Sequence, residues 1–184
     1  MIRLTVVAFF TLTWLIAAPV SAQTYKLCPV SEFADCTFAQ KCTVKDGKIT
    51  CPDCKIRRDI TSVVLAKDGC VAAKDREMQS RFPGTGLKYA QLCGPGYQVK
   101  FQRTWASCLD VKCTSTGIET ATCDCEKPAT GVPYVAARET NSYDPKLCVD
   151  PGPNMAISSA TAADAIAIQG FLNAPIWVNQ REPQ

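Results

Sequence analysis

A Cys-x-x-Cys pair, Cys51-Pro52-Asp53-Cys54, is the spacing in this chain that most directly suggests chemistry. In thioredoxin-like proteins such a pair opens a helix, which lowers the pKa of the nucleophilic cysteine. Here the pair follows strand-forming residues and lacks the surrounding alternation of strands and helices. We therefore expect Cys51 and Cys54 to be structural, with an exported thiol-redox protein that uses them as the alternative.

The chain contains twelve cysteines, which fall into two successive sets of six with similar spacings. Their neighbours agree as well, since Lys41-Cys42-Thr43 corresponds to Lys112-Cys113-Thr114 and Asp53-Cys54 corresponds to Asp124-Cys125. Such a repeat predicts two modules built alike. The first set is Cys28, Cys36, Cys42, Cys51, Cys54 and Cys70, and the second is Cys93, Cys108, Cys113, Cys123, Cys125 and Cys148.

The N-terminal residues predict export. Arg3 precedes an apolar run that ends in Val20-Ser21-Ala22, the small residues of a cleavage site, so residues 1–22 are expected to be a signal peptide. A membrane anchor is the alternative, because the run approaches the length of a bilayer span. Exported chains with an even cysteine count normally oxidise them. We expect a secreted or periplasmic protein with every cysteine in a disulfide. The protein should contact a membrane only through its signal peptide, before that peptide is cleaved.

Composition excludes several kinds of chemistry. The absence of histidine removes the usual base of serine and cysteine proteases and the imidazole ligands of metal sites. No two acidic residues have a spacing that indicates a catalytic pair, although such a pair can also form in three dimensions. With 20 basic and 17 acidic residues, the chain lacks the dense positive charge of a nucleic-acid-binding protein. We expect no enzymatic activity, no cofactor and no metal, since secretion favours disulfides over zinc.

A β-hairpin is predicted between Cys42 and Cys51. Strand-forming residues flank Asp46-Gly47, a strong signal for a two-residue type I′ turn. This register places Cys42 opposite Cys51 at a close pair without hydrogen bonds, where they bond to each other or each to a neighbouring segment. The equivalent hairpin, Cys113–Cys123, has one more residue, so its turn at Gly117 is expected to be longer or bulged.

The cysteine spacing resembles that of epidermal growth factor-like modules. That family places a hairpin between its third and fourth cysteines and one residue between its fourth and fifth, as in Cys123-Asp124-Cys125; the first set departs from this with Cys51-Pro52-Asp53-Cys54. The resemblance implies that the first cysteine pairs with the third, the second with the fourth and the fifth with the sixth. For this chain the implied pairs are Cys28–Cys42, Cys36–Cys51, Cys54–Cys70, Cys93–Cys113, Cys108–Cys123 and Cys125–Cys148.

Two breaks rich in proline and glycine divide the chain. Residues 23–78 are predicted to form module 1, 79–88 a linker, 89–150 module 2 and 151–184 a C-terminal tail. The expected fold is small, disulfide-rich and mainly β, with two tandem six-cysteine hairpin modules and a short C-terminal helix.

The helix is predicted over residues 162–172 in the tail. Thr161 and Asp164 resemble a capping box, and Pro175 stops the helix. A helix this short needs a surface to pack on, either the modules themselves or a partner. In the second case Phe171 and Trp177 are among the expected contact residues.

The function expected from these features is that of a non-catalytic interaction protein whose loops bind a protein or glycan partner. Little conformational entropy is lost when a loop on a stapled scaffold docks. The basic run of Lys55, Arg57 and Arg58 is a candidate contact for the partner. A protease inhibitor is an alternative, in which this run is an exposed loop that offers a basic residue to a trypsin-like protease.

Overall fold

The computed structural model describes residues 24–39, 41–85, 89–94, 104–129, 131–138, 144, 148, 154–170 and 177–179. These residues form a mainly β protein with six disulfides and one short helix near the C-terminus. The predicted signal peptide, residues 1–22, lies outside the described residues. Within the described ranges, no helix combines the length and apolarity that a membrane crossing needs.

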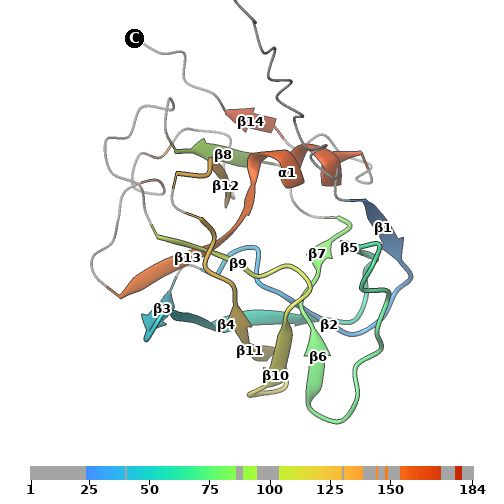
Figure 1. Ribbon diagram of the computed structural model, residues 1–184. Coiled ribbons are helices and arrows are strands. Elements are labelled where there is room, and N and C mark those ends of the chain that lie inside the picture. The colour runs from blue at the N-terminus through green and yellow to red at the C-terminus, as the bar shows by residue number, and fades with distance from the viewer. Residues whose placement is uncertain are drawn as a thin grey trace, which may run out of the picture.

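Strands from both cysteine sets share one sheet (Figure 1). Its order is β14-β8-β12-β13-β3-β4-β11-β10-β6, with β2 beside β4 and β9 beside β13, while β1, β5 and β7 form a smaller sheet. The elements are β1 (Tyr25–Cys28), β2 (Phe33–Asp35), β3 (Cys42–Lys45), β4 (Lys48–Arg57), β5 (Ser62–Leu65), β6 (Glu77–Gln79), β7 (Phe82–Pro83), β8 (Tyr89–Cys93), β9 (Trp105–Ser107), β10 (Lys112–Ser115), β11 (Thr120–Cys125), β12 (Tyr134–Arg138), β13 (Met155–Thr161), α1 (Ala162–Gln169) and β14 (Trp177–Asn179).

Both predicted hairpins are confirmed. In the β3–β4 hairpin, Lys45 lies opposite Lys48, and Asp46 and Gly47 have φ values of 50° and 76°, as the two central residues of a type I′ turn require. In the β10–β11 hairpin, the last paired residues are Ser115 and Ala121, so its turn is longer, as expected. The two hairpins are joined because β11 pairs with β4 in antiparallel orientation.

The difference between Cys-x-x-Cys and Cys-x-Cys is explained by a bulge where β4 meets β11. Cys123 lies opposite Cys51, and Ala121 lies opposite Cys54, with a register shift between them. Side chains alternate along a strand, so Cys123 and Cys125 share a face across one residue. An extra residue in β4 brings Cys51 and Cys54 to one face as well, and all four side chains are buried.

The disulfides nest in the same way in both sets, and the pairing implied by the resemblance to epidermal growth factor is wrong. In each set the first cysteine bonds to the sixth, the second to the fifth and the third to the fourth. Hairpin register explains the innermost bond, because the third and fourth cysteines already lie opposite each other. The bonds are Cys28–Cys70, Cys36–Cys54, Cys42–Cys51, Cys93–Cys148, Cys108–Cys125 and Cys113–Cys123.

No disulfide crosses between the sets, but the sheet and the core do. The largest core cluster contains Cys36, Cys42 and Ile56 from the first half together with Cys113 and Ala121 from the second. Side chains from both predicted modules pack in one cluster. The boundaries between the modules remain predictions from sequence.

Residues 79–83, within the predicted linker, take part in this packing. Ser80 and Arg81 are almost fully buried. The backbone N–H of Ser80 donates to Val111 O at 2.9 Å, and that of Arg81 donates to Ala34 O at 2.9 Å. Ser80 thus connects this segment to the second half of the chain, and Arg81 connects it to the first. The bounds of the linker remain a prediction.

The predicted helix is present as α1, with Thr161 as its N-cap: Thr161 Oγ1 accepts a hydrogen bond from the backbone N–H of Asp164 at 3.0 Å. The helix ends at Gln169, before the predicted stop at Pro175. Ile168 is fully buried in a cluster with Tyr25 and Val63. The described part of the helix thus packs on the protein itself.

Candidate functional site

The predicted basic contact run does not form a loop. Lys55 and Arg57 belong to β4, whose edges pair with β2 and β11 around these positions. Arg57 Nε also lies 3.2 Å from Asp35 Oδ2 in an ion pair. The protease-inhibitor interpretation required an exposed loop at this run, and the strand pairing removes that loop.

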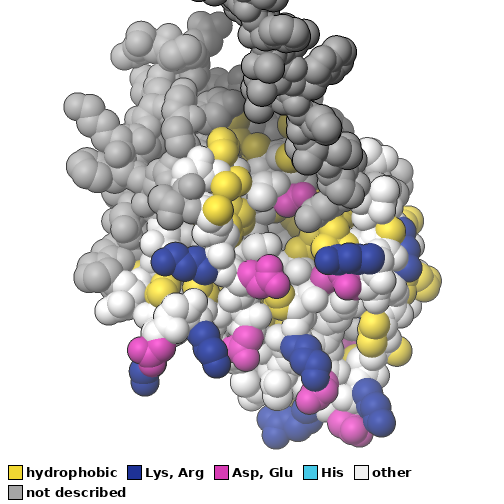
Figure 2. All heavy atoms as spheres, in the orientation of Figure 1, with side chains coloured by type: hydrophobic (Ala, Val, Ile, Leu, Met, Phe, Trp, Pro, Cys, Tyr) yellow, Lys and Arg dark blue, Asp and Glu magenta, His cyan; other side chains and the backbone are white. Residues whose placement is uncertain are grey.

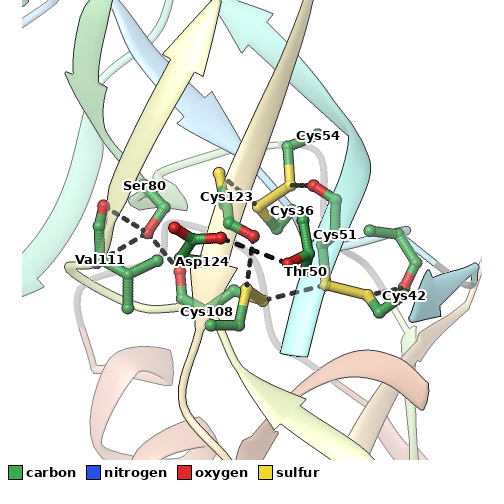
Figure 3. Close-up of a disulfide and its surroundings, with 12 residues drawn as sticks. Cys36, Cys42, Thr50, Cys51, Cys54, Ser80, Cys108, Val111, Cys123 and Asp124 are labelled. Atoms are coloured by element: carbon green, nitrogen blue, oxygen red, sulfur yellow. Dashed lines mark hydrogen bonds between the residues drawn. A yellow bond between two sulfur atoms is a disulfide. The ribbon is translucent and has the colours of Figure 1, made fainter. Parts of the chain in front are cut away.

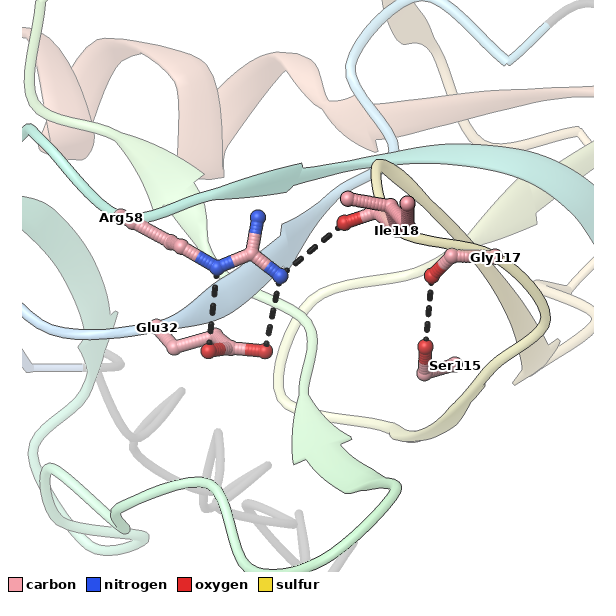
Figure 4. A network of polar contacts seen from close by, with 5 residues as sticks. All are labelled: Glu32, Arg58, Ser115, Gly117 and Ile118. Carbon is pink, nitrogen blue, oxygen red and sulfur yellow. Dashed lines mark hydrogen bonds and ion pairs between the residues drawn. The ribbon is translucent and has the colours of Figure 1, made fainter.

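Arg58, the residue after β4, instead connects the first half of the chain to the second (Figure 4). Its Nε and Nη2 donate to the two carboxylate oxygens of Glu32 at 3.2 and 3.4 Å. Nη2 also donates to the backbone oxygen of Ile118 at 3.0 Å. Because a guanidinium group holds its donors in a fixed plane, this fork fixes the turn of the β10–β11 hairpin relative to β4.

The turn itself is ordered by local hydrogen bonds. Ser115 Oγ donates to Gly117 O at 2.8 Å, and the backbone N–H of Thr116 donates to Thr120 O at 2.9 Å. The N–H of Ile56 in β4 donates to Glu119 O at 2.8 Å. We call residues 115–120 the hairpin tip.

Ile118 lies at the centre of the hairpin tip with 87% of its surface exposed. Single exposed apolar residues are common on protein surfaces and need no functional explanation by themselves. What distinguishes Ile118 is its position in a turn that is hydrogen-bonded internally and clamped by Arg58 from the other half of the chain. The hydrogen bonds thus hold the backbone of the turn, from which the apolar side chain of Ile118 projects into water.

On one face of the described residues, charges do not gather by sign. Figure 2 shows a face on which Lys and Arg side chains alternate with Asp and Glu side chains. Even near the hairpin tip, Lys55 and Arg58 are accompanied by Glu32 and Glu119. Such a surface favours a partner with an apolar contact over a highly charged polymer.

Of the two predicted C-terminal contact residues, the structure describes one. Phe171 lies outside the described residues. Trp177 belongs to β14, whose backbone pairs with β8 in parallel orientation, Trp177 opposite Tyr89. On α1, Ile166 is 67% exposed.

Cys51 and Cys54 do not bond to each other, because Cys51 bonds to Cys42 and Cys54 bonds to Cys36. The chain has no free cysteine. Cys51 and Cys54 therefore do not form the dithiol or mutual disulfide that the exported thiol-redox alternative requires. Two groups of three sulfurs lie close enough to hold a metal, but all of them are in disulfides, and a cysteine binds a metal as its thiolate.

A polar cavity of about 360 Å³ lies beside the start of α1. Asp110 Oδ2 accepts from the backbone N–H of Leu65 at 2.6 Å, and Asp164 Oδ1 accepts from the hydroxyl of Tyr25. These bonds connect β5 and β1 to the second half of the chain, so both carboxylates have structural partners and we assign the cavity no reaction. Its charged lining is Lys67, Asp68, Asp110, Glu126, Lys127 and Asp164.

Burial shapes the electrostatics of this region. It raises the pKa of Asp110 to about 6, while the hydrogen bond from Leu65 opposes the rise. The pKa of Tyr25 is also raised. Burial is the larger cause, and the hydrogen bond to Asp164 is the next. Arg81, whose guanidinium attracts Asp110, has its pKa lowered by burial. Asp110 Oδ1 and Arg81 Nε are buried with no hydrogen-bond partner among the described residues.

Sequence reasoning missed both Glu32 and Ile118. The extra residue in the second turn was the available signal for Ile118, since a longer turn projects farther than the tight turn at Gly47. Glu32 carries no signal, because its partner Arg58 is 26 residues away and only the fold brings them together.

The chain matches no protein-family model, and comparisons with curated proteins and with solved structures also gave no match. The functional assignment therefore depends on the geometry of the hairpin tip.

Proposed function

We propose that this is a secreted or periplasmic, non-catalytic interaction protein that binds a protein partner through the hairpin tip. Six disulfides indicate an oxidising, extracellular-type compartment, and the predicted signal peptide supports export. The observation that carries the proposal is the 87% exposure of Ile118 in a turn clamped by Arg58.

The clamp matters because an ordered loop loses little conformational entropy when it binds. Glu32, Arg58 and the hydrogen bonds of Ser115 and Thr116 fix the hairpin tip before a partner arrives. Transfer of one exposed isoleucine into an apolar pocket contributes about 1.5–3 kcal/mol. In this proposal Ile118 is the apolar anchor, and Lys55, Arg58 and Glu119 form a polar rim around it.

A protein partner fits this surface better than a glycan. Ile118 is aliphatic and projects from a convex turn, which suits an apolar pocket on the partner. A glycan needs a site that offers many hydrogen bonds, and at the hairpin tip Ser115 Oγ, the N–H of Thr116, and Nε and Nη2 of Arg58 are already bonded within the protein.

The equivalent nesting of disulfides and the two hairpins support a further part of the proposal, that the chain consists of two tandem six-cysteine hairpin modules. In this view the modules diverged at their turns. The first keeps a tight turn at Gly47, and the second has a longer turn that carries the contact residue.

Site-specific photo-crosslinking tests the proposal. p-Benzoylphenylalanine placed at Ile118 should cross-link to a protein in the periplasmic or secreted fraction of the source organism, and excess unlabelled wild type should compete. The same residue placed at Ile166, a comparably exposed isoleucine on α1, is the matched control and should give no competed cross-link.

Binding of the identified protein then gives a quantitative test. Ile118→Ala should weaken the affinity about tenfold or more, and Ile118→Asp should abolish competition, whereas Ile166→Asp should leave both unchanged. Equal cross-linking from both positions would contradict the hairpin tip as the contact. Binding to a glycan array that Ile118→Asp retains would replace the protein partner by a glycan bound elsewhere.

A further inference from the structure

Four of the six disulfides touch in pairs, and each contact joins the two cysteine sets. Figure 3 shows the two contacts, Cys36 with Cys123 and Cys51 with Cys108. Cys36 Sγ lies 3.3 Å from Cys123 Sγ, so the Cys36–Cys54 bond lies against Cys113–Cys123. Cys51 Sγ lies 3.5 Å from Cys108 Sγ, so Cys42–Cys51 lies against Cys108–Cys125. Oxidised sulfur carries no proton, and these are therefore non-bonded contacts between disulfides.

The pairing of β4 with β11 produces these contacts. Because Cys123 lies opposite Cys51 and Ala121 lies opposite Cys54, the bonds of the two hairpins meet across the strand pair. Cys113 Sγ also lies within 4.8 Å of Cys36 Sγ, and Cys125 Sγ lies within 4.8 Å of Cys51 Sγ. Each attacking sulfur must therefore rotate into line with the bond that it breaks before exchange occurs.

We propose that each contact is a thiol–disulfide exchange site that can convert bonds within the sets into bonds between them. A thiolate attacks one sulfur of a disulfide and expels the other as a thiolate, so the number of disulfides is conserved. When Cys36 is a thiolate, it attacks Cys123 Sγ, the Cys36–Cys123 bond forms, the Cys113–Cys123 bond breaks, and Cys113 leaves as the thiolate.

The reagent that starts the exchange in the wild-type protein is a low-molecular-weight thiol. Its thiolate attacks Cys54 Sγ, forms a mixed disulfide there and releases Cys36 as the thiolate that reacts next. The same sequence on the other side starts at Cys42, passes through Cys51 and Cys108 and releases Cys125. These sulfurs are buried, so the sites stay dormant until the thiol gains access.

The products differ from the starting protein in their connectivity. The existing six bonds leave the two sets covalently independent except through the backbone, whereas Cys36–Cys123 or Cys51–Cys108 cross-links them. Burial in apolar surroundings raises the pKa of a thiol, and only the thiolate reacts. Exchange should therefore accelerate as the solution is made alkaline.

A single substitution tests the first site without an external thiol. Cys54→Ser leaves Cys36 unpaired beside the Cys113–Cys123 bond. The expected result after incubation at mildly alkaline pH is a Cys36–Cys123 bond and a free thiol at Cys113, identified by alkylation with iodoacetamide and mass spectrometry of the non-reduced digest. Cys42→Ser should likewise move the free thiol to Cys125.

The matched control is Cys70→Ser, which leaves Cys28 unpaired. Among the described residues, no sulfur of another disulfide contacts the Cys28–Cys70 bond, so the free thiol should stay at Cys28. Retention of the thiol on Cys36 in folded Cys54→Ser, or equal migration in the control, would overturn the proposal.

Wild-type protein provides a second test that does not depend on the folding of a variant. Wild-type protein incubated with a trace of glutathione in urea below its unfolding transition, where local opening admits the thiol, should yield peptides that link Cys36 to Cys123 or Cys51 to Cys108. If the digest contains only bonds within the sets and their reduced forms, the exchange sites do not operate.

Discussion

At the scale of single residues, burial acts on two charged groups, Asp110 and Arg81, by shifting the pKa of each. Asp110 adopts a left-handed backbone conformation, with φ of 58°, that lets its carboxylate accept the N–H of Leu65. Arg81 donates through Nη1 to Ser31 Oγ at 2.8 Å and through Nη2 to Val71 O. These two residues also attract each other electrostatically.

Asp110 should make stability depend on pH. Its folded-state pKa is raised from 3.8 to about 6, so the folded protein holds this proton more tightly than the unfolded chain. The contribution to stability is complete below pH 3.8 and is lost as the pH rises through about 6. Asp110→Asn mimics the protonated form and should therefore stabilise the protein at neutral pH.

The expected gain is about 1 kcal/mol at neutral pH, because solvent screening around this half-buried residue reduces the ~3 kcal/mol of the full shift. Near the acid end of the range, the variant and the wild type should have equal free energies of unfolding. Urea denaturation across this pH range measures the difference, with the exposed Asp59→Asn as control. A gain that is independent of pH would show that ionisation of Asp110 is not its cause.

At the scale of elements, α1 depends on its cap and on one buried face. The helix has 8 residues, too few for stability in isolation. Ile168 anchors it in a cluster with Tyr25 and Val63. Asp164 has two functions, since its backbone N–H donates to the cap and its carboxylate accepts from Tyr25.

Removal of the cap oxygen should destabilise this element. Thr161→Ala leaves the N–H of Asp164 without its acceptor and should cost about 1 kcal/mol in free energy of unfolding. Thr161→Ser keeps the oxygen and should cost less. Hydrogen exchange of the Asp164 and Ala165 amides reports on the helix directly. Equal losses for both substitutions would mean that the methyl group in β13, rather than the cap, is responsible.

At the scale of the whole molecule, covalent bonds supply much of the constraint on the chain. The outer bond Cys28–Cys70 spans 42 residues, whereas Cys42–Cys51 spans 9. Loop-closure entropy grows with the logarithm of this span. The outer bonds should therefore restrict the unfolded chain more strongly than the hairpin bonds do.

Replacing both cysteines of a bond by alanine tests this ranking. In the loop-entropy estimate, loss of Cys28–Cys70 costs about 4 kcal/mol and loss of Cys42–Cys51 costs about 2.5 kcal/mol. Thermal or urea unfolding of the two double variants under non-reducing conditions gives the comparison. A larger loss for the hairpin bond would indicate that packing around its sulfurs, and not loop closure, dominates.

Local features were predictable because their causes are local. Asp46-Gly47 fixes its turn through backbone preference, and Thr161 caps the following helix from three residues away. The bulge at Cys51-Pro52-Asp53-Cys54 and the pairing of β4 with β11 were not predictable, because they depend on strands far apart in the chain. For the same reason, the prediction of an exposed loop at Lys55, Arg57 and Arg58 was wrong. Whether a segment is an exposed loop depends on which strands pair with it.

The sequence by itself determined that the cysteines come in two matched sets, that each set surrounds a hairpin and that a capped helix follows. These properties depend on spacing and on short-range preference. Only the tertiary structure decided which cysteines bond, how the two sets merge into one sheet and core, and that Arg58 fixes the hairpin tip bearing Ile118. Such contacts join residues that are far apart in the chain. Many arrangements of distant segments satisfy the same local preferences, and packing selects one of them.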